Sequence, residues 1–125
     1  MASAFNCSRV FSRTLRQADY PDVTVVADKA AETVKKLRAQ QGKDIWLFGG
    51  GSLFRSLLEA RLVDTVEVAV IPILLGEGIP MLPPPAQRAK LRLVGNKVYK
   101  TGIVSLEYAI EYATTRKRAG RKRTR

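Results

Sequence analysis

The residues best suited to binding a ligand are three consecutive glycines, Gly49, Gly50 and Gly51, followed by Ser52. They separate an apolar run from a segment with helical spacing, so we expect a strand-to-helix turn. Glycine loses more backbone entropy on folding than any other residue, so three in a row need a physical reason. Free amides at a helix N-terminus bind phosphate, and side chains in the turn would keep it away. With the Ser52 hydroxyl as a further donor, the turn is predicted to bind a pyrophosphate.

A second interpretation of this turn stays open, in which the glycines serve only the geometry of a tight connection. The segment has neither the Gly-Lys-Ser/Thr of a Walker loop nor the spaced glycines of a Rossmann fingerprint. Three adjacent glycines are therefore a weak motif, and the choice between the two interpretations depends on other residues.

Ser12, Arg13 and Thr14 form the second candidate site, directly after a short β-branched and aromatic run at residues 9–11. An arginine with two hydroxyls is a good phosphate-binding group, because charge-assisted hydrogen bonds to anions are strong. The alternative is an exposed loop with an ordinary surface arginine. Residues 9–11 are predicted to form a strand that ends at this loop.

Residues that are absent exclude several kinds of chemistry. The chain has no histidine, which removes imidazole general bases, histidine-dependent triads and nearly all common zinc sites. Cys7 is the sole cysteine, so no internal disulfide can form, and a cytosolic setting is expected. No apolar run reaches the roughly 18 residues of a membrane span. No metal site and no membrane partner are predicted.

The first half of the chain alternates predicted strands and helices. After a strand at residues 23–26, Asp28 can cap a helix that Gly42 ends. Residues 45–48 (Ile-Trp-Leu-Phe) have the unbroken apolar pattern of a strand buried on both faces. An amphipathic helix follows from Ser52, with Leu53 on its apolar face. This order predicts α/β architecture with parallel strand pairing.

The later third is predicted to be antiparallel. Strands are expected at residues 66–72, 91–94, 97–100 and 103–112, the last two joined in a hairpin through Thr101 and Gly102. A glycine- and proline-rich loop occupies residues 76–85. Antiparallel strands added to a parallel core make a mixed sheet. The bulk composition fits one domain, assigned to residues 1–112.

Most of the formal charge of +11 lies at the C-terminus. Residues 113–125 hold seven basic and no acidic residues, so 15 basic against 11 acidic side chains leave only +4 for the body. We expect this tail to be a solvated, disordered extension. The alternative is that it binds nucleic acid through its dense positive charge, without sequence preference.

Several motifs, in order and at compatible spacing over roughly residues 8–112, resemble the dihydrofolate-reductase-like family that includes the riboflavin-biosynthesis reductase (RibD C-terminal) domain. They are Val10-Phe11-Ser12-Arg13-Thr14-Leu15, the stretch 43–53 around the glycines, Leu62-Val63-Asp64, the loop 72–79 and the strand 102–108. The resemblance implies a dihydrofolate-reductase-like three-layer α/β fold, with a mixed, mostly parallel sheet, flanking helices and a C-terminal antiparallel hairpin.

The resemblance also implies NADPH as the cofactor. In this family the glycine pair contacts the dinucleotide diphosphate, often through a cis peptide, which carries over to Gly49 and Gly50. The neighbouring Gly51, Ser52 and Leu53 are assigned to the same cofactor site. Ser12, Arg13 and Thr14 match the family loop that holds the adenosine 2′-phosphate. Asp64 is expected to be a cap or turn residue, and Glu77 either borders the substrate pocket or is a solvated loop carboxylate.

Family members normally begin with a strand, a substrate-facing loop, a helix and a further strand before the Ser-Arg-Thr segment, which this chain is expected to lack. Without the first strand, its neighbours would expose unpaired backbone edges, which a partner chain could cover, for instance in a homodimer. We expect a reductase-like domain acting on a pteridine or an aminopyrimidine riboflavin precursor such as 5-amino-6-(5-phosphoribosylamino)uracil. No catalytic residue is assigned, and a non-catalytic interaction module is the alternative.

Overall fold

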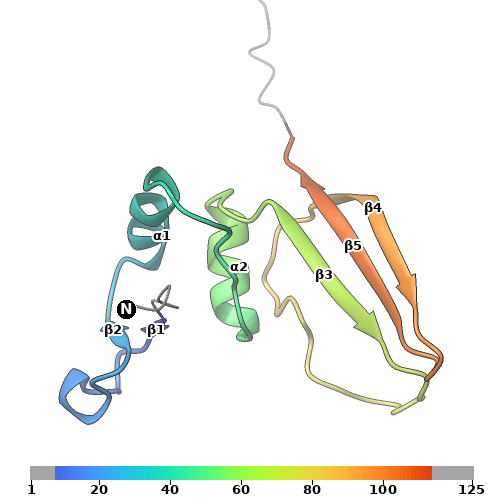
Figure 1. The fold of residues 1–125 in the computed structure, drawn as a ribbon, viewed down its shortest axis with the longest axis horizontal. Coiled ribbons are helices and arrows are strands. Elements are labelled where there is room, and N and C mark those ends of the chain that lie inside the picture. The colour runs from blue at the N-terminus through green and yellow to red at the C-terminus, as the bar shows by residue number, and fades with distance from the viewer. Residues whose placement is uncertain (1–7, 114–125) are drawn as a thin grey trace, which may run out of the picture. The chain divides into compact units, whose positions relative to one another are not determined.

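A computed structural model describes residues 8–113 of the chain, so the predicted basic tail lies outside the described residues from residue 114 onward. Two compact units make up the chain, one from the N-terminal part through Val63 with Leu75–Gln87, the other from Asp64–Leu74 with residue 88 onward. The elements, in chain order, are β1 (Arg9–Phe11), a 3-10 turn η1 (Gln17–Asp19), β2 (Thr24–Val26), α1 (Ala30–Ala39), α2 (Gly51–Glu59), β3 (Thr65–Val70), β4 (Lys90–Val98) and β5 (Val104–Glu111) (Figure 1).

The first unit contains a parallel two-stranded sheet. Strand β1 pairs with β2 in the register Val10 opposite Val25, and the amide of Ser12 extends the ladder by donating to the carbonyl of Val26 at 3.0 Å. Both strands lie where β-branched residues predicted them, and their parallel pairing is confirmed. The connection carries the turn η1, where the side-chain amide of Gln17 donates to the carbonyl of Val23 at 2.7 Å.

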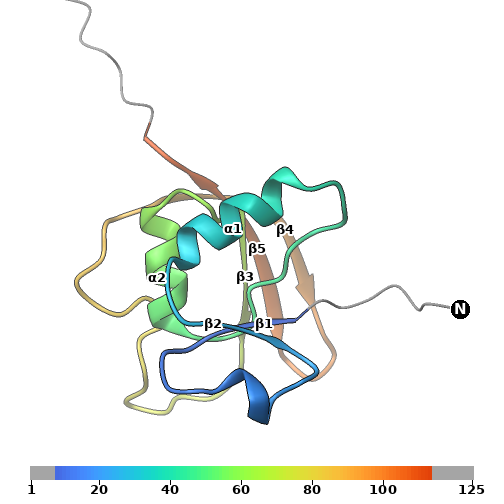
Figure 2. The same ribbon diagram turned by 90° about the vertical axis from the view of Figure 1, so that its left-hand side faces the viewer.

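Two helices supply the buried side chains of the first unit. Helix α1 has its apolar residues at helical spacing, and α2 follows the glycines as predicted, beginning at Gly51. The helices contact one another, and both Figure 1 and Figure 2 show them side by side. Among the described residues, the buried hydrophobic side chains are Val34 of α1 and Leu57 and Leu58 of α2, which are 5–7% exposed. The helix pair is therefore the packed centre of this unit.

The prediction of a buried strand at residues 45–48 is wrong. The segment has no strand assignment, and its Trp46 and Phe48 side chains are 83% and 94% exposed. The apolar pattern shows that these side chains favour burial. A strand also requires a neighbouring strand to form hydrogen bonds with its backbone groups. Within residues 8–113, β1 pairs only with β2, and no other strand adjoins residues 45–48.

The second unit is an antiparallel three-stranded sheet in the order β3-β5-β4. The hairpin of β4 and β5 confirms the predicted C-terminal hairpin, but residues 91–94 and 97–100 do not form two strands. They lie largely in the single strand β4, which continues through a register shift between Leu93 and Gly95. The parallel and antiparallel pairings expected in one mixed sheet thus occupy two sheets of the described chain.

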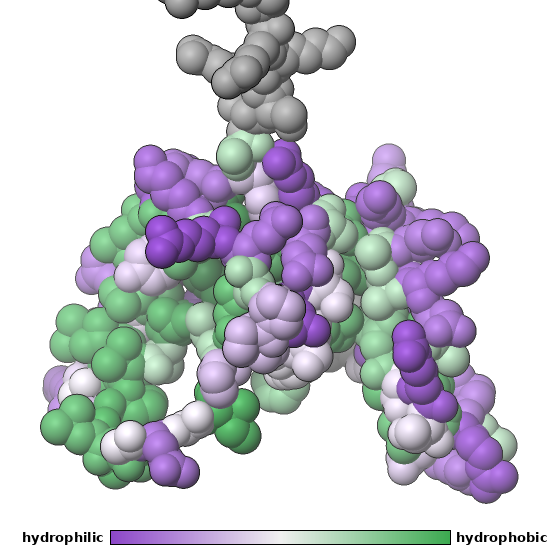
Figure 3. All heavy atoms as spheres, turned by 180° about the vertical axis from the view of Figure 1, so that it is seen from behind, coloured by the Kyte–Doolittle hydropathy of each residue, from purple (hydrophilic) through white to green (hydrophobic). Residues whose placement is uncertain are grey.

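Alternation along β3 and β5 gives this sheet a polar and an apolar face. Glu67 lies opposite Glu107 on one face, and Val68 opposite Leu106 on the other. Hydrophobic side chains also reach the surface around one end of the sheet and the loop after β3, where Leu74 is 101% exposed (Figure 3). The sheet therefore has less apolar cover than its sequence pattern requires.

Candidate functional site

The glycine turn opens onto free space at its first two residues. Gly49 and Gly50 have φ values of +74° and +81°, which side chains rarely adopt. A Cβ atom at Gly49 would meet no other atom within 4 Å, and one at Gly50 would meet only the Cβ of Leu53 at 3.8 Å. The backbone at both glycines is thus accessible to a ligand, and the left-handed conformation explains why glycine is used there.

Gly51 has a different role from its neighbours. A Cβ at this position would lie 2.9 Å from the carbonyl oxygen of Met81 and 3.0 Å from Cδ of Pro83. The loop that approaches it is also held by Arg55 of α2, whose Nη1 donates to the carbonyl of Pro84 at 3.0 Å. The close approach of the protein's own loop is a sufficient reason for glycine at position 51. At this position the geometric interpretation of the turn therefore explains the residue.

Helix α2 presents unbonded amides next to this turn. Its first intrahelical hydrogen bond runs from the amide of Phe54 to the carbonyl of Gly50 at 3.0 Å. The preceding amides, of Gly51, Ser52 and Leu53, have no acceptor within the described residues, as expected at a helix N-terminus. The Ser52 side chain is exposed and no side chain caps the helix. Three N–H groups and one hydroxyl are therefore free to bind an anion here.

The peptide bond between the two leading glycines does not have the cis form that the family pattern suggested. In the described chain the one cis bond joins Pro84 and Pro85. A non-proline cis bond costs about 3–4 kcal/mol, whereas the positive φ angles of Gly49 and Gly50 reverse the chain at little cost. The expectation of a cis Gly49–Gly50 bond is wrong for this structure.

The second candidate loop is ordered by its own serine. Ser12 Oγ accepts hydrogen bonds from the amides of Thr14 and Leu15, at 3.3 and 3.2 Å, and lies 3.3 Å from Thr14 Oγ1. This arrangement is an ST-turn, in which the hydroxyl replaces a backbone acceptor. The lone pairs of Ser12 Oγ thus hold the turn, while its neighbours Arg13 and Thr14 are exposed.

Arg13 is held loosely by one carboxylate. Its Nε lies 3.7 Å from Oδ1 of Asp28, and the two side chains are 84% and 73% exposed. Asp28 was predicted to cap the following helix, but the N-cap is Lys29 and no side chain bonds the free amides there. An exposed ion pair at this distance contributes about 0–1 kcal/mol, so Arg13 can exchange Asp28 for a phosphate at little cost.

Both candidate loops belong to the first unit, but no hydrogen bond or ion pair in the described chain joins them. The structure therefore places each loop separately and leaves their joint use of one ligand as a prediction. Of the weaker candidates, Asp64, expected to be a cap or turn residue, lies directly before β3, and its carbonyl accepts the amide of Ile110 of β5 at 2.9 Å. Glu77 lies exposed in its loop.

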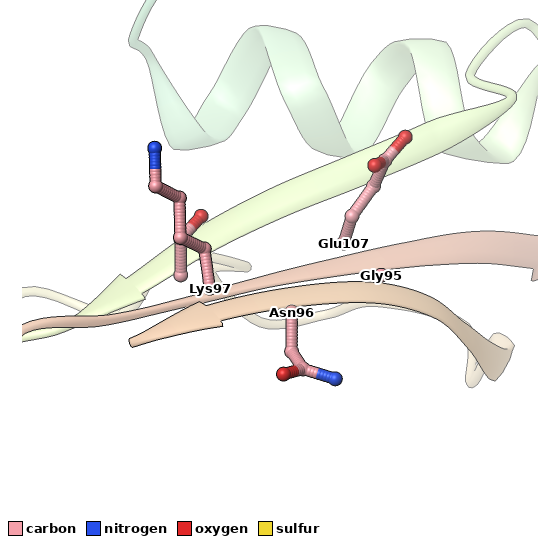
Figure 4. Close-up of a pocket in the computed structure, with 5 residues that line it drawn as sticks. Gly95, Asn96, Lys97 and Glu107 are labelled. Carbon is pink, nitrogen blue, oxygen red and sulfur yellow. The ribbon is translucent and has the colours of Figure 1, made fainter. Parts of the chain in front are cut away.

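Sequence inspection missed a shallow cleft on the polar face of the antiparallel sheet. It is lined by Lys97, Ser105 and Glu107, with Gly95 and Asn96, and Figure 4 shows Lys97 and Glu107 pointing to one side of the sheet and Asn96 to the other. The hydroxyl of Ser105 donates to Glu67 at 2.8 Å. The cleft has a volume of about 180 Å³, which is below the roughly 300 Å³ of the smallest typical ligand pockets. The alternation of side chains along the strands could have predicted which of these residues share a face of the sheet. It could not have predicted the cleft.

Two further searches concern residues 8–113 only. No group of three or more acidic, cysteine or histidine side chains there is arranged to hold a metal ion. In the same residues, no helix has the length and apolar character needed to cross a bilayer. The groups that the two candidate loops offer to a ligand are backbone amides, hydroxyls and the guanidinium of Arg13.

Known sequences resemble this chain over most of the residues described above. The model of the family described as the RibD C-terminal domain matches residues 8–105. The uncharacterized protein YyaP of Bacillus subtilis (strain 168) is 37% identical over 99 residues, covering 79% of this chain and 52% of YyaP. The uncharacterized protein YwjB of the same organism is 32% identical over 77 residues, covering 62% and 44%. The chain thus spans about half the length of the curated relatives it matches.

Comparison with solved structures shows a shared fold. A proposed riboflavin biosynthesis protein from Shewanella sp. PV-4 matches with a TM-score of 0.70 at 20% identity, over 90% of this chain and 65% of the other. A pyrimidine reductase-like protein from Corynebacterium diphtheriae gives 0.61 at 20% identity, over 73% and 40%. The expected dihydrofolate-reductase-like α/β fold is confirmed by this likeness.

Proposed function

The chain belongs to the RibD C-terminal domain family, and on this basis we propose that it binds NADPH as part of a reductase acting on an aminopyrimidine precursor of riboflavin. The observation that carries the cofactor proposal is the open backbone at Gly49 and Gly50 beside the free amides of α2. The names of the two solved structures, which refer to riboflavin biosynthesis and pyrimidine reduction, support the reaction class. A cytosolic location fits the single cysteine of the chain.

The pyrophosphate of the cofactor is assigned to the start of α2. Amides of Gly51, Ser52 and Leu53 point out of the first helical turn, and the helix dipole adds to their positive potential. The Ser52 hydroxyl is a further donor. The absence of side chains at Gly49 and Gly50 lets phosphate oxygens approach the backbone. These residues fit a diphosphate by their donor chemistry and their open geometry.

The 2′-phosphate of the cofactor is assigned to the loop after β1. Arg13 supplies a guanidinium, and Thr14 supplies an exposed hydroxyl. Ser12 acts mainly through the turn, because its oxygen already accepts two amides. When bound, NADPH supplies the hydride, and the residues described here bind and orient it. None of them is assigned as the proton donor.

Adding a negative charge at the start of α2 tests the proposal without weakening the fold. In Ser52→Asp, the new carboxylate favours the helix N-terminus but repels a pyrophosphate. We expect NADPH affinity, followed by nicotinamide fluorescence, to fall at least tenfold while the melting temperature is maintained or rises. Ser56→Asp places the same charge one turn further along and should change affinity by less than about threefold.

Two results would contradict the proposal. One is the absence of saturable binding to the unmodified chain at millimolar NADPH. The other is an equal affinity of the Ser52→Asp variant and the unmodified chain, since a diphosphate at this helix terminus cannot be indifferent to an added carboxylate. Turnover of an aminopyrimidine substrate is a separate assay, because binding alone does not establish reduction.

A further inference from the structure

The connection between β3 and β4 lies against the first turn of α2 (Figure 1). Its residues 80–85, here called the proline loop, belong to the same compact unit as the helix. A Cβ added at Gly51 would lie 2.9 Å from the carbonyl oxygen of Met81 and 3.4 Å from that of Pro80. The proline loop therefore lies directly beside the unbonded amides that begin α2.

Arg55 of α2 fastens the proline loop to the helix. Its Nη1 donates to the carbonyl of Pro84 at 3.0 Å and to that of Pro83 at 3.4 Å. The prolines at positions 83–85 have no N–H, so this part of the backbone offers only carbonyl groups to a hydrogen bond. Arg55 follows Gly51 by four positions, about one helical turn, so both contacts lie on one face of α2.

No carboxylate competes for Arg55 within residues 8–113. The residue is half-buried, and its polar partners in that range are the two loop carbonyls. Glu59 follows Arg55 at the spacing of a helical ion pair, yet the guanidinium bonds the loop instead. Arg13 and Arg16, by contrast, each pair with an aspartate. The Arg55 side chain is therefore committed to holding the loop.

The loop carbonyls are acceptors that could satisfy the free amides of α2. Unbonded amides at a helix N-terminus attract a nearby acceptor, whether a phosphate oxygen or a carbonyl of the chain itself. The proline loop is close enough, since the Met81 carbonyl already approaches Gly51. A loop released from Arg55 can place a carbonyl on these amides and occupy the anion site. The donors are local to α2, but the loop decides whether they are open.

We propose that Arg55 is a positioning residue of the dinucleotide site, which holds the proline loop away from the first-turn amides of α2. This role rests on the proposed function and extends it to a residue that acts through the loop. The pyrophosphate is common to NADPH and NADH, so loss of Arg55 should weaken the binding of both equally. Arg13 differs in this respect, because it is assigned to the 2′-phosphate alone.

Replacement of Arg55 by leucine tests the role, because leucine keeps the helix propensity and removes every donor. A charge-assisted hydrogen bond shifts an equilibrium by roughly tenfold or more, so the loop should occupy the amides in a large share of molecules. We expect NADPH and NADH affinities, from nicotinamide fluorescence well below the melting temperature of each variant, to fall together by about three- to tenfold. Arg55→Lys restores a donor and should recover binding to within about twofold. Lys35→Leu, which removes an exposed cation of α1, should leave binding unchanged.

Met81 reports the position of the loop without any cofactor. The chain has two methionines, and the methyl ¹³C signal of Met81 is the one that Met81→Leu removes. Arg55→Leu should shift this signal in the free protein, whereas Arg55→Lys and Lys35→Leu should leave it in place. An unshifted signal in Arg55→Leu overturns the proposed role, because the loop would not depend on Arg55.

Salt separates positioning from direct attraction of the cofactor. If Arg55 acted by its charge on the pyrophosphate, the difference between the unmodified chain and Arg55→Leu would shrink as the Debye length falls from about 10 Å at 0.1 M salt to about 3 Å at 1 M. A loop held by hydrogen bonds predicts a difference that stays constant within about twofold over this range.

Failure of the cofactor site and failure of the Arg55 role give different results. If the unmodified chain does not bind NADPH, the proposed function is wrong and the role of Arg55 in it is wrong too. If the unmodified chain binds, three results overturn the role and leave the proposed function standing. They are unchanged binding in Arg55→Leu, a loss confined to NADPH, and a loss that disappears at high salt.

Discussion

Arg13 is predicted to make this protein prefer NADPH over NADH, and its replacement by alanine isolates that preference. Within residues 8–113 its one ion pair is with Asp28, with Nε and Oδ1 3.7 Å apart, and its side chain is 84% exposed. Loss of this pair costs about 0–1 kcal/mol, so Arg13→Ala should leave the fold intact. Changes in binding can then be attributed to the ligand.

The magnitude follows from the interactions exchanged. A hydrogen bond to a charged group contributes about 1.5–3 kcal/mol. Arg13 gives up at most about 1 kcal/mol of interaction with Asp28 to make it. The net of about 0.5–3 kcal/mol corresponds to a loss of roughly 2- to 160-fold in NADPH affinity. NADH has no 2′-phosphate, so its affinity should change by less than about twofold.

Fluorescence titration with both dinucleotides measures this difference. Arg16→Ala is the matched control, because Arg16 is also an exposed arginine with one acidic partner, its Nε lying 3.2 Å from Oδ2 of Asp19. The control should bind both dinucleotides as the unmodified chain does. An equal loss of NADPH and NADH affinity in Arg13→Ala would refute the assignment, because the side chain would then act on something other than the 2′-phosphate.

Two further substitutions test individual contacts. Gly51→Ala should destabilise the fold by about 1–3 kcal/mol in urea unfolding, because its Cβ would lie 2.9 Å from the carbonyl oxygen of Met81. Gly42→Ala, whose Cβ would meet nothing within 4 Å, is its control, and equal stability of the two variants would contradict the packing argument. Asp28→Asn should tighten NADPH binding about threefold, since a carboxylate some 6 Å from a phosphate costs about 0.7 kcal/mol in water. Weaker binding in this variant would show that Asp28 positions Arg13.

The elements that the sequence predicted well are those that local residues determine. Helix α1 and helix α2 follow from the spacing of apolar residues, and the hairpin of β4 and β5 from strand propensity on either side of Gly102. Gly102 has φ +89° and lies against Pro72, which is consistent with its place in the turn. Each of these depends on neighbours within a few turns or on one adjacent strand.

The predictions that failed depend on distant residues. Residues 45–48 have the composition of a buried strand, but burial requires partners that no local pattern reveals. The cap assigned to Asp28 was wrong because the N-cap is Lys29, and the Asp28 carboxylate lies instead near Arg13, fifteen positions earlier in the chain. For Gly51, the reason for glycine is a contact with Met81, thirty residues later. Sequence spacing identified the positions and could not identify their partners.

The proposed phosphate site depends on little of this long-range structure. Its donors are amides that the start of any helix leaves free, and the turn before them is set by the positive φ of Gly50. Helix α2 in turn is anchored by Leu57 and Leu58, the side chains it buries. Leu57→Ala, which removes one of these buried anchors, should therefore destabilise the fold by about 2–5 kcal/mol in urea unfolding, while the folded chain should still bind NADPH within about twofold of the unmodified chain.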